Sequence, residues 1–388
     1  MKRIGIDARF YGKAGPGRYT KNIVTHLEKI DLENEYFVFL RKDGFESYFP
    51  ENKNCKKILA NYNWYSFDEQ IRFLFKVVFS KLDLFYTPHF NFPILYPGKI
   101  VAAIPDMTMH TFSTEKGTTL PKPYFKLKKL VYRLVFKWLI LRAKKIIVPT
   151  NTVLDEFTRI FKGISKSKFI VAYEGVDPDL LNLSVSNNDL VLEKYRVKKP
   201  YILYVGSMYE HKNISGLVEM YKILKDSFGY NGILVLVCKK DKFSQKVYED
   251  LREQNLGEKI LIPAFNVKSD TDIVVTDEET VSFRKQADVY VCPSFKEGFS
   301  LTALEAMSVG LASVISDIPC HREVYGDSVL YFNPKDHQDM AKKVNRVLID
   351  TELKNNLIVK GYKQIKKYNW HNTAQTTLDI FKHVLKNG

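Results

Sequence analysis

The chain contains 388 residues, 45% of them hydrophobic and 27% charged, which is the composition of a folded protein long enough for two domains. It has no run of about 18 apolar residues, so a membrane-spanning helix is not expected. The four cysteines form no C-x-x-C pair, which disfavours a zinc site or a disulfide framework and favours a reducing compartment. The sequence opens on a strand pattern instead of an apolar signal segment, so we expect a cytoplasmic protein.

The net charge of +15, from 59 Lys and Arg against 44 Asp and Glu, predicts an anionic partner: a phosphorylated ligand, an anionic lipid or a nucleic acid. Residues 121–145 hold nine basic residues and no acidic one. Two stripes in this segment follow helical spacing, one apolar (Leu127, Leu130, Leu134, Trp138 and Leu141) and one basic (Lys126, Lys129, Arg133 and Lys137). The segment predicts either a packed helix with a basic solvent face or a helix on an anionic membrane. In both cases we expect much of the apolar stripe to pack against the first sheet. No nucleic-acid-binding motif accompanies the charge, so nucleic acid is the least favoured partner.

In the first half of the chain, short apolar strands alternate with helices. We predict strands at 2–7, 36–40, 84–88, 100–104 and 145–149 and in 168–178, and helices at 18–30, 121–145 and 150–161. Residues 182–199 have no strong core pattern and are typical of a connection.

The alternation restarts in the second half. We predict strands at 201–206, 232–238, 259–263, 288–294 and 312–316, helices at 212–228, 242–255 and 277–286 and from Ser300, and a last helix at 370–388. Two successive β-α-β series predict an α/β protein of two doubly wound, Rossmann-like sheets facing a cleft. The expected organisation is a domain at 1–178, a linker at 179–199, a second domain at 200–368, and a C-terminal helix at 369–388 that is a candidate for return to the first domain.

The segment KEGFSLTALEAMSVG, residues 296–310, places Glu297 just before a predicted helix and Glu305 inside it. Ser300 suits the N-cap position and Gly310 suits the C-terminal stop. The first backbone amides would point out of the helix N-terminus, where they favour a phosphate. The simpler alternative is a favourable acid–dipole pair plus a loop glutamate in water. In doubly wound sheets ligands bind beyond the carboxyl ends of the strands, where this segment lies.

Two other segments also follow predicted strands. GKAGPGRYT (12–20) contains Gly15 and Gly17, which allow close approach to the backbone at the start of the helix expected from Arg18. VGSMYEHKN (205–213) ends near Lys212, whose ammonium would neutralise a diphosphate. Each has a simpler alternative, because glycine turns after strands are common and a single lysine is most often solvated.

These motifs together resemble the retaining nucleotide-sugar glycosyltransferases of family 4, which have the GT-B architecture. KEGFSLTALEAMSVG is similar to the signature of that family, and VGSMYEHKN is similar to its VGxxxxRKN stretch. RIGIDARFYGKAGPGRYT, TPHFNFPILY and DSVLYFNP resemble the mannosyltransferase-like subgroup. The matches occur in the right order and span residues 2 to 375.

The resemblance implies a role for each matching residue. Glu297 would contact the hexose, Glu305 would hold the ribose through its two hydroxyls, and Lys212 would neutralise the departing diphosphate. The backbone amides of Gly298 and Phe299 would lie near the sugar hydroxyls, and those of Ser300 and Leu301 would face the diphosphate. The donor-binding set is completed by Gly15, Gly17, Gly206, Ser207 and His211.

The chain departs from the family pattern at three places. Ser207 stands where many members have arginine, and His211 stands where the RKN arginine would be. On the acceptor side Pro105 replaces the usual histidine, while Asp106 is retained. His110 and His89 are the candidates to substitute for that histidine, and either could equally be structural. We therefore expect Glu297, Lys212, Asp106 and His110 to act in catalysis.

The resemblance implies front-face attack with retention, so no carboxylate nucleophile is required. No DxD-like metal site is evident, so we predict no metal and no cofactor, with a nucleotide sugar (GDP-mannose favoured) as donor substrate. The expected acceptor is a saccharide or lipid-linked saccharide in surface polysaccharide assembly, and an anionic membrane on the cytoplasmic side is a candidate partner. The alternatives are a sugar-nucleotide epimerase and a catalytically impaired nucleotide-sugar-binding protein. A nicotinamide dehydrogenase is disfavoured because GxGxxG and its ribose acid are missing.

Overall fold

The computed structural model describes residues 1–388 except 13, 113–121, 177–187, 268–274 and 388. The chain forms two compact units: unit 1 comprises Met1–Gly175 with Asn369–Gly388, and unit 2 comprises Val176–Tyr368. Two segments of unit 1 meet at Gly175, where an added Cβ would fall 2.4 Å from the backbone nitrogen of Trp370. Only glycine fits this approach of two chain segments.

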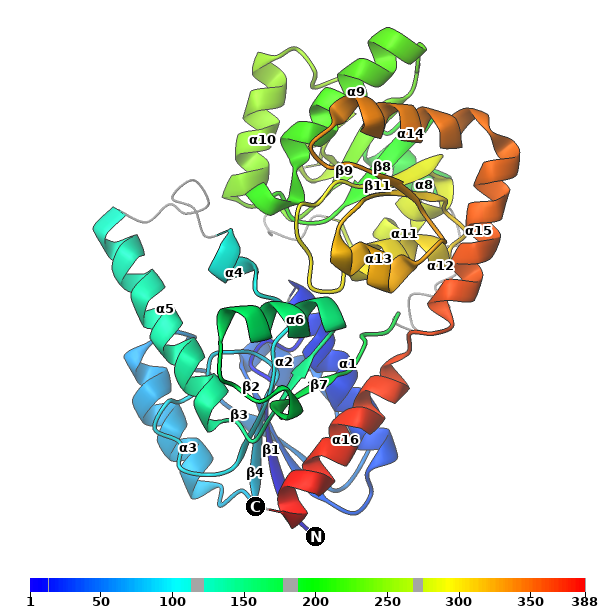
Figure 1. Ribbon diagram of the computed structural model, residues 1–388. Helices are drawn as coiled ribbons and strands as arrows, with labels where there is room; N and C mark the ends of the chain where they lie inside the picture. The colour runs from blue at the N-terminus through cyan, green and yellow to red at the C-terminus, as the bar shows by residue number, and fades with distance from the viewer. Residues whose placement is uncertain (13, 113–121, 177–187, 268–274, 388) are drawn as a thin grey trace. The chain divides into compact units, whose positions relative to one another are not determined.

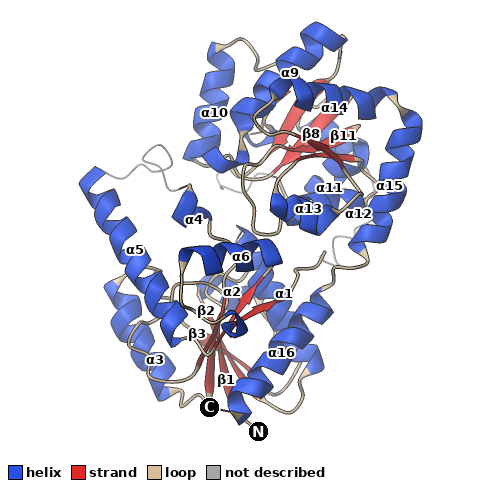
Figure 2. Cartoon of the chain, in the orientation of Figure 1, coloured by secondary structure: helices blue, strands red, loops and turns tan. Residues whose placement is uncertain are grey.

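Unit 1 is built on a parallel seven-stranded sheet with the strand order β3-β2-β1-β4-β5-β6-β7 (Figure 2). Its strands are β1 Arg3–Asp7, β2 Glu35–Leu40, β3 Cys55–Leu59, β4 Leu84–Thr87, β5 Ile100–Ala103, β6 Lys145–Val148 and β7 Phe169–Val171. The central strands are buried on both faces, which is why they appear in the sequence as continuous apolar runs. The sequence did not predict β3, an edge strand that carries Lys56 and Lys57.

Helices surround this sheet (Figure 1). They are α1 Ala14–Ile30, α2 Lys42–Ser47, the π-helix η1 Glu69–Phe73, α3 Leu74–Phe79, α4 Thr108–Thr111, α5 Lys122–Arg142, α6 Asn151–Ile160, the 3₁₀ turn η3 Lys166–Lys168 and α16 Trp370–Lys386. The last helix of the chain packs on the first: the rings of Tyr19 and Trp370 make an edge contact at 5.6 Å. Phe381 packs on Tyr86 of β4 in the same way, at 5.2 Å. α16 is therefore part of unit 1.

The apolar stripe of α5 does not pack against the sheet, and that prediction was wrong. Leu127, Leu134 and Trp138 are 58%, 59% and 45% exposed. The buried side of α5 is instead lined by other residues, among them Phe136 and Leu139, because Phe136 stacks on two aromatic rings of the α6 region. None of the helices in the described part of the chain is both long and apolar enough to cross a bilayer.

Unit 2 is built on a parallel six-stranded sheet with the order β10-β9-β8-β11-β12-β13. Its strands are β8 Tyr201–Val205, β9 Ile233–Val237, β10 Ile260–Leu261, β11 Val289–Cys292, β12 Ser313–Ser316 and β13 Leu330–Phe332. Its helices are α8 Asn188–Lys194, the 3₁₀ turn η4 Glu210–Lys212, α9 Ile214–Phe228, α10 Lys242–Glu253, the 3₁₀ turn η5 Pro263–Phe265, α11 Asp277–Gln286, α12 Leu301–Ser308, α13 Pro319–Tyr325, α14 His337–Ile349 and α15 Thr351–Ile365. Two doubly wound sheets were predicted from the sequence, and this prediction is confirmed.

Residues 188–197 differ from the sequence prediction, which treated them as a connection. They form α8 and a buried turn in unit 2. The ring of Tyr195 is fully buried, and its hydroxyl donates to the carboxylate of Glu279 on α11 at 2.7 Å. The segment was missed because only three of its apolar residues, Leu192, Tyr195 and Val197, are buried. Three positions among charged residues are too few to reveal a helical period in the sequence.

Candidate active site

Lys212 and Glu297 form a close ion pair in unit 2. Lys212 ends η4 directly after β8, and Glu297 lies in the loop after the neighbouring strand β11. The ammonium of Lys212 donates to both carboxylate oxygens of Glu297, at 2.7 and 2.8 Å. The two side chains are 19% and 10% exposed, so the pair is largely shielded from water without being sealed. Both groups therefore lie at the carboxyl edge of the sheet, where such folds bind ligands.

The carboxylate of Glu297 is positioned by a chain of hydrogen bonds. The hydroxyl of Ser294 donates to Glu297 Oε1 at 2.7 Å, and Ser316 at the end of β12 donates to the carbonyl of Ser294 at 2.6 Å. Burial by itself would raise the pKa of Glu297, but the charge of Lys212 outweighs it, so this pKa is lowered. Glu297 is therefore a carboxylate at neutral pH, fixed in orientation.

Asn213 connects two loops of the site to the start of α9. It adopts the left-handed conformation (φ 55°) and caps α9, accepting from the backbone nitrogen of Gly216 at 3.2 Å. Its amide nitrogen donates to the carbonyls of Pro293 and Pro334, at 3.2 and 2.9 Å. The loop after β11 and the loop after β13 are thereby joined to the residue that follows Lys212.

The start of α12 has an unusual geometry. Ser300 occupies the N-cap position as expected, but it is left-handed (φ 71°) and its side chain accepts no capping hydrogen bond. Its carbonyl instead accepts from the hydroxyl of Tyr325. Phe299 is buried against the ring of Tyr368 at 5.4 Å. The segment from Gly298 to Leu301 is thus held by packing, and the amides that begin α12 are not occupied by the Ser300 hydroxyl.

Glu305 lies one turn further along α12 and is buried. Its carboxylate forms an ion pair with the guanidinium of Arg284 on α11, and the two side chains are 2% and 3% exposed. The Nε atom of Arg284 is buried and has no hydrogen-bond partner among the residues that the structure describes. Glu305 therefore balances a buried charge of unit 2, a role that the sequence did not predict. Its assignment to the ribose stays a prediction.

The remaining positions expected to bind the donor follow β8 in unit 2 and β1 in unit 1. A Cβ on Gly206 would fall 2.7 Å from the hydroxyl of Tyr204, which also donates to the carbonyl of Ser207 at 2.7 Å. In unit 1, α1 begins at Ala14 and not at Arg18, so Gly15 and Gly17 belong to its first turn. A Cβ on Gly17 would fall 2.1 Å from the carbonyl oxygen of Phe10. His211 is partly exposed, and its carbonyl accepts from Phe295 at 2.8 Å.

The acceptor-side candidates lie in unit 1, with Asp106 and His110 after β5 and His89 after β4. Asp106 accepts from the backbone nitrogen of Thr108 at 2.8 Å and starts α4. His110 Nδ1 is hydrogen-bonded to the hydroxyl of Tyr132 at 2.7 Å, inside an aromatic cluster. His89 is half-buried, and desolvation together with the charge of Arg9 lowers its pKa to about 3. The side chains of His110 and His89 thus have structural contacts, and a catalytic role for His110 stays a prediction.

A sulfur, a carboxylate oxygen and a ring nitrogen from Cys292, Glu297 and His321 lie within 4.8 Å of one another. A cation here would meet the ammonium of Lys212, which already bonds both oxygens of Glu297. Burial also raises the pKa of the Cys292 thiol, which disfavours the thiolate that a metal requires. The three residues therefore fit a divalent ion poorly.

Ser294, Arg284 and His321 were missed because no motif marks them. His321 is fully buried on α13, and its Nδ1 donates to the carbonyl of Ser316 at 2.8 Å, which leaves Nε2 without a hydrogen-bond partner. Burial lowers its pKa to about 4, although Glu297 partly opposes this. Only the fold brings Ser294 and His321 to the carboxylate of Glu297, and Arg284 to that of Glu305.

Comparison with known proteins finds a family match in unit 2 and relatives of the chain. Residues 191–364, nearly all of unit 2, match the family described as glycosyl transferases group 1. The O-antigen chain mannosyltransferase RfbU of Salmonella typhimurium is 24% identical over 354 residues, which are 87% of this chain and 88% of that protein. The O-antigen chain mannosyltransferase B of Escherichia coli is 28% identical over 248 residues, 62% of this chain and 61% of that protein.

Among solved structures, sucrose-phosphate synthase from Thermosynechococcus elongatus superposes with a TM-score of 0.74 at 17% identity, and the alignment covers 100% of both chains. At this identity the likeness concerns the fold, which is the GT-B architecture. Family match, relatives and fold confirm the resemblance drawn from the motifs. Unit 2 thus matches the group 1 glycosyltransferases, and the chain is similar to the mannosyltransferase-like group of family 4.

Proposed function

We propose that this protein is a retaining glycosyltransferase that moves a hexose from a nucleotide-diphosphate sugar to a saccharide acceptor. The observation that carries the proposal is the Lys212–Glu297 pair, held at the carboxyl ends of β8 and β11 beside the uncapped start of α12. One cation and a row of backbone amides suit a diphosphate. A fixed carboxylate suits the hydroxyls of a hexose, because it accepts two hydrogen bonds.

In the proposed reaction, a hydroxyl oxygen of the acceptor bonds to the anomeric carbon on the face from which the diphosphate leaves. The bond between that carbon and the diphosphate oxygen breaks, and the hydroxyl proton passes to the departing oxygen. Negative charge grows on the diphosphate, so Lys212 contributes most in the transition state. Glu297 is engaged by Lys212 and Ser294, which supports a binding role for its carboxylate in preference to a nucleophilic one.

The proposed reaction needs no metal ion. Lys212 supplies the positive charge at the diphosphate, and the nearest cluster of possible ligands, around Cys292, is ill-suited to a divalent cation for the reasons given above. We propose GDP-mannose as the donor because the relatives RfbU and mannosyltransferase B are both O-antigen chain mannosyltransferases by name. By the same comparison, the acceptor is a growing surface polysaccharide or its lipid-linked precursor.

The donor assignment is tested by calorimetry with GDP-, UDP-, ADP- and dTDP-sugars, followed by a transfer assay with the sugar that binds. NMR of the product then gives the anomeric configuration. We expect GDP-mannose to bind and its α-linkage to be retained in the product. Inversion would refute the retaining mechanism, and donor turnover to an isomeric nucleotide sugar without any acceptor would identify an epimerase.

We also propose that unit 1 docks on an anionic membrane through α5. The helix exposes an apolar stripe, described above, together with the basic residues Lys128, Arg133 and Lys137. Exposed apolar side chains mixed with basic ones are typical of interfacial helices. Each basic residue near an anionic surface contributes about 1 kcal/mol.

A second element extends this surface. η1 and α3 expose Ile71, Phe75 and Phe79, and Phe79 is 75% exposed. The segment after β4 connects the two elements: Ile94 accepts from Trp138 of α5 at 2.9 Å and donates to Gln70 of η1 at 2.9 Å. We call the exposed apolar residues of η1, α3 and α5 the docking surface. Apolar side chains on two elements should make membrane binding stronger than basic residues alone would. Salt does not screen the burial of apolar side chains in the bilayer, whereas it screens the attraction between charges.

Vesicle co-sedimentation tests the docking surface. Wild type should bind vesicles with anionic lipid more strongly than neutral ones, and high salt should weaken binding without abolishing it. Two variants should each lose most binding: Lys128→Gln/Arg133→Gln/Lys137→Gln and Leu134→Ser/Phe79→Ser. Ile349→Ser removes an equally exposed apolar residue (72%) from unit 2 and should bind like wild type. Binding that ignores lipid charge, or survives both multiple variants, would refute the proposal.

A further inference from the structure

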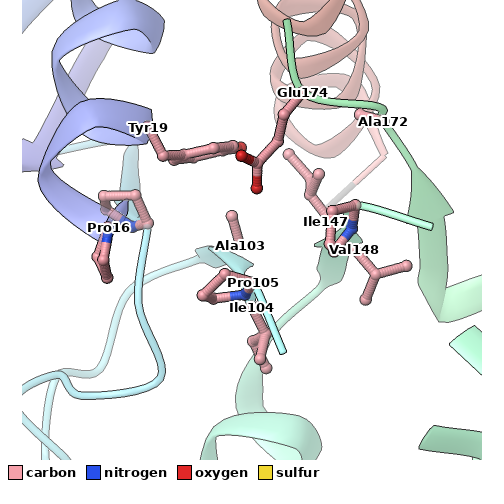
Figure 3. A pocket seen from close by; sticks show the side chains of 11 residues that line it. Pro16, Tyr19, Ala103, Ile104, Pro105, Ile147, Val148, Ala172 and Glu174 are labelled. Atoms are coloured by element: carbon pink, nitrogen blue, oxygen red, sulfur yellow. The ribbon is translucent and has the colours of Figure 1, made fainter. Parts of the chain in front are cut away.

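Unit 1 contains a small pocket at the carboxyl ends of β4, β5, β6 and β7 (Figure 3). The first turns of α1 contribute Pro16 and Tyr19 to its wall, and Glu174 enters it from the segment that follows β7. All of its lining residues belong to unit 1. The pocket is apolar except for a few groups, which is typical of a ligand-binding site.

The carboxyl group of Glu174 points into this pocket (Figure 3). The residue is only 7% exposed, and among the residues that the structure describes none donates a hydrogen bond to it. The groups that face it are the phenols of Tyr19 and Tyr86 and the carboxylate of Asp106. Burial raises the pKa of Glu174 to about 8, and Asp106 adds to this, so the group is largely protonated at neutral pH. A buried carboxyl group with no partner requires an explanation.

The described pocket walls offer few donors to Glu174. Four prolines, Pro16, Pro88, Pro105 and Pro149, line the pocket, and proline has no backbone N–H to donate. The hydroxyl of Tyr19 is already hydrogen-bonded to that of Tyr86 at 2.9 Å. The acid of Glu174 can thus donate one hydrogen bond and accept another, and both remain available for a bound molecule.

The size of the pocket limits what can enter. Its free interior admits a group of about the size of one water molecule, so a hydroxyl fits and a sugar ring does not. The position is also informative. Pro105, which replaces the acceptor-side histidine implied by the family resemblance, forms part of the wall beside Glu174. The carboxyl group that lines the pocket therefore comes from the segment after β7, and Pro105 after β5 contributes no polar side chain to it.

We propose that Glu174 holds one hydroxyl of the acceptor saccharide in this pocket. The inference rests on the proposed glycosyltransferase function and adds to it an acceptor-binding residue. A neutral acid donates to the hydroxyl oxygen and accepts from its proton, which fixes the direction of that hydroxyl as well as its position. The same acid distinguishes a sugar that has this hydroxyl from a deoxy sugar, because losing the hydroxyl leaves the carboxyl unpaired.

The test compares full-length wild type, Glu174→Ala, Glu174→Gln and the exposed control Glu51→Ala. The donor is the nucleotide sugar selected by calorimetry, and the acceptor probes are methyl glycosides of mannose, galactose and N-acetylglucosamine. We expect Glu174→Ala to raise the acceptor KM at least tenfold and leave the donor KM unchanged. Glu174→Gln keeps one donor and one acceptor and should stay within threefold of wild type, as should Glu51→Ala. Binding of the same glycosides, followed by saturation-transfer NMR, should be lost in Glu174→Ala alone.

An unchanged acceptor KM in Glu174→Ala would show that the pocket holds only a water molecule, and it would overturn the proposal. So would a Glu174→Gln variant as impaired as Glu174→Ala, or an equal rise of both KM values at unchanged thermal stability. Failure of the proposed function has a different signature, because wild type itself would then transfer no sugar to any acceptor.

Discussion

The buried pair of Glu305 and Arg284 makes a prediction that separates folding from ligand binding. Glu305→Ala would leave the guanidinium of Arg284, 3% exposed, without its counter-charge inside unit 2. Removing one partner of a buried ion pair typically costs about 3 to 5 kcal/mol. In a unit of this size each kcal/mol lowers Tm by about 2 to 4 °C, so the expected fall is on the order of 10 °C.

Thermal and urea unfolding, followed by circular dichroism, measure this loss. Glu305→Gln keeps the hydrogen bond to Arg284 and should lose less, and Glu305→Leu/Arg284→Met should regain much of the stability because both charges are absent. Glu219→Ala is the matched control: it removes an exposed partner, 2.8 Å from Lys222, and should cost under about 1 kcal/mol. If Glu305→Ala unfolds at the wild-type temperature, the carboxylate does not balance a buried charge.

The folded variant Glu305→Gln then tests the ribose assignment. If Glu305 contacts ribose, the variant should bind a nucleoside diphosphate more weakly than wild type in calorimetry, because a neutral amide accepts more weakly than a carboxylate. Unchanged affinity would mean that the residue acts only within unit 2.

Three further predictions concern charge at the two sites. Lys212→Ala should cut transfer at least tenfold and weaken diphosphate binding much more than nucleoside binding; an equal loss for both ligands in calorimetry would point to a folding defect. Transfer should continue unchanged in EDTA, and an absolute need for magnesium or manganese would contradict the proposed role of Lys212. Glu174→Gln should unfold at a higher temperature than wild type at pH 8, and the two should be alike at pH 4.5. The sign follows from burial, which raises the folded-state pKa from 4.5 to about 8. The stability that the neutral acid contributes is therefore fully present below pH 4.5 and is lost as the pH rises through about 8. A difference that does not change with pH would contradict this.

The alternation of strands and helices was predictable because buried parallel strands leave continuous apolar runs in the sequence. Lys212 and Glu297, 85 positions apart, could both be assigned to strand ends, although their direct contact could not. The edge strand β3 was missed because its exposed side carries lysines. The orientation of α5 was misjudged because the helix has a second apolar side, which includes Phe136 and Leu139. Only packing decides which of the two sides is buried.

The partners of Glu297 and Glu305 lay beyond prediction for a different reason. Ser294, Ser316 and Arg284 are ordinary residues in ordinary positions, and their importance arises from what the sheet order places next to them. Glu174 was also overlooked, since a single glutamate at the end of an apolar run resembles a solvated loop residue. Its burial becomes apparent only once α1 and the ends of four strands enclose it.

Glu297 and Glu174 show how one residue type serves two purposes at neutral pH. Both are largely shielded from water, and desolvation raises the pKa of each. The charge of Lys212 then lowers the pKa of Glu297, whereas none of the described residues brings a cation into contact with Glu174. Glu297 is therefore an anion that can only accept hydrogen bonds, which suits a hexose whose hydroxyls all donate. Glu174 is a neutral acid that can also donate a hydrogen bond. This suits an acceptor hydroxyl whose orientation must be fixed. Environments that push two carboxyl pKa values apart are how active sites assign different roles to the same group, and here each assignment follows from whether a lysine is within reach.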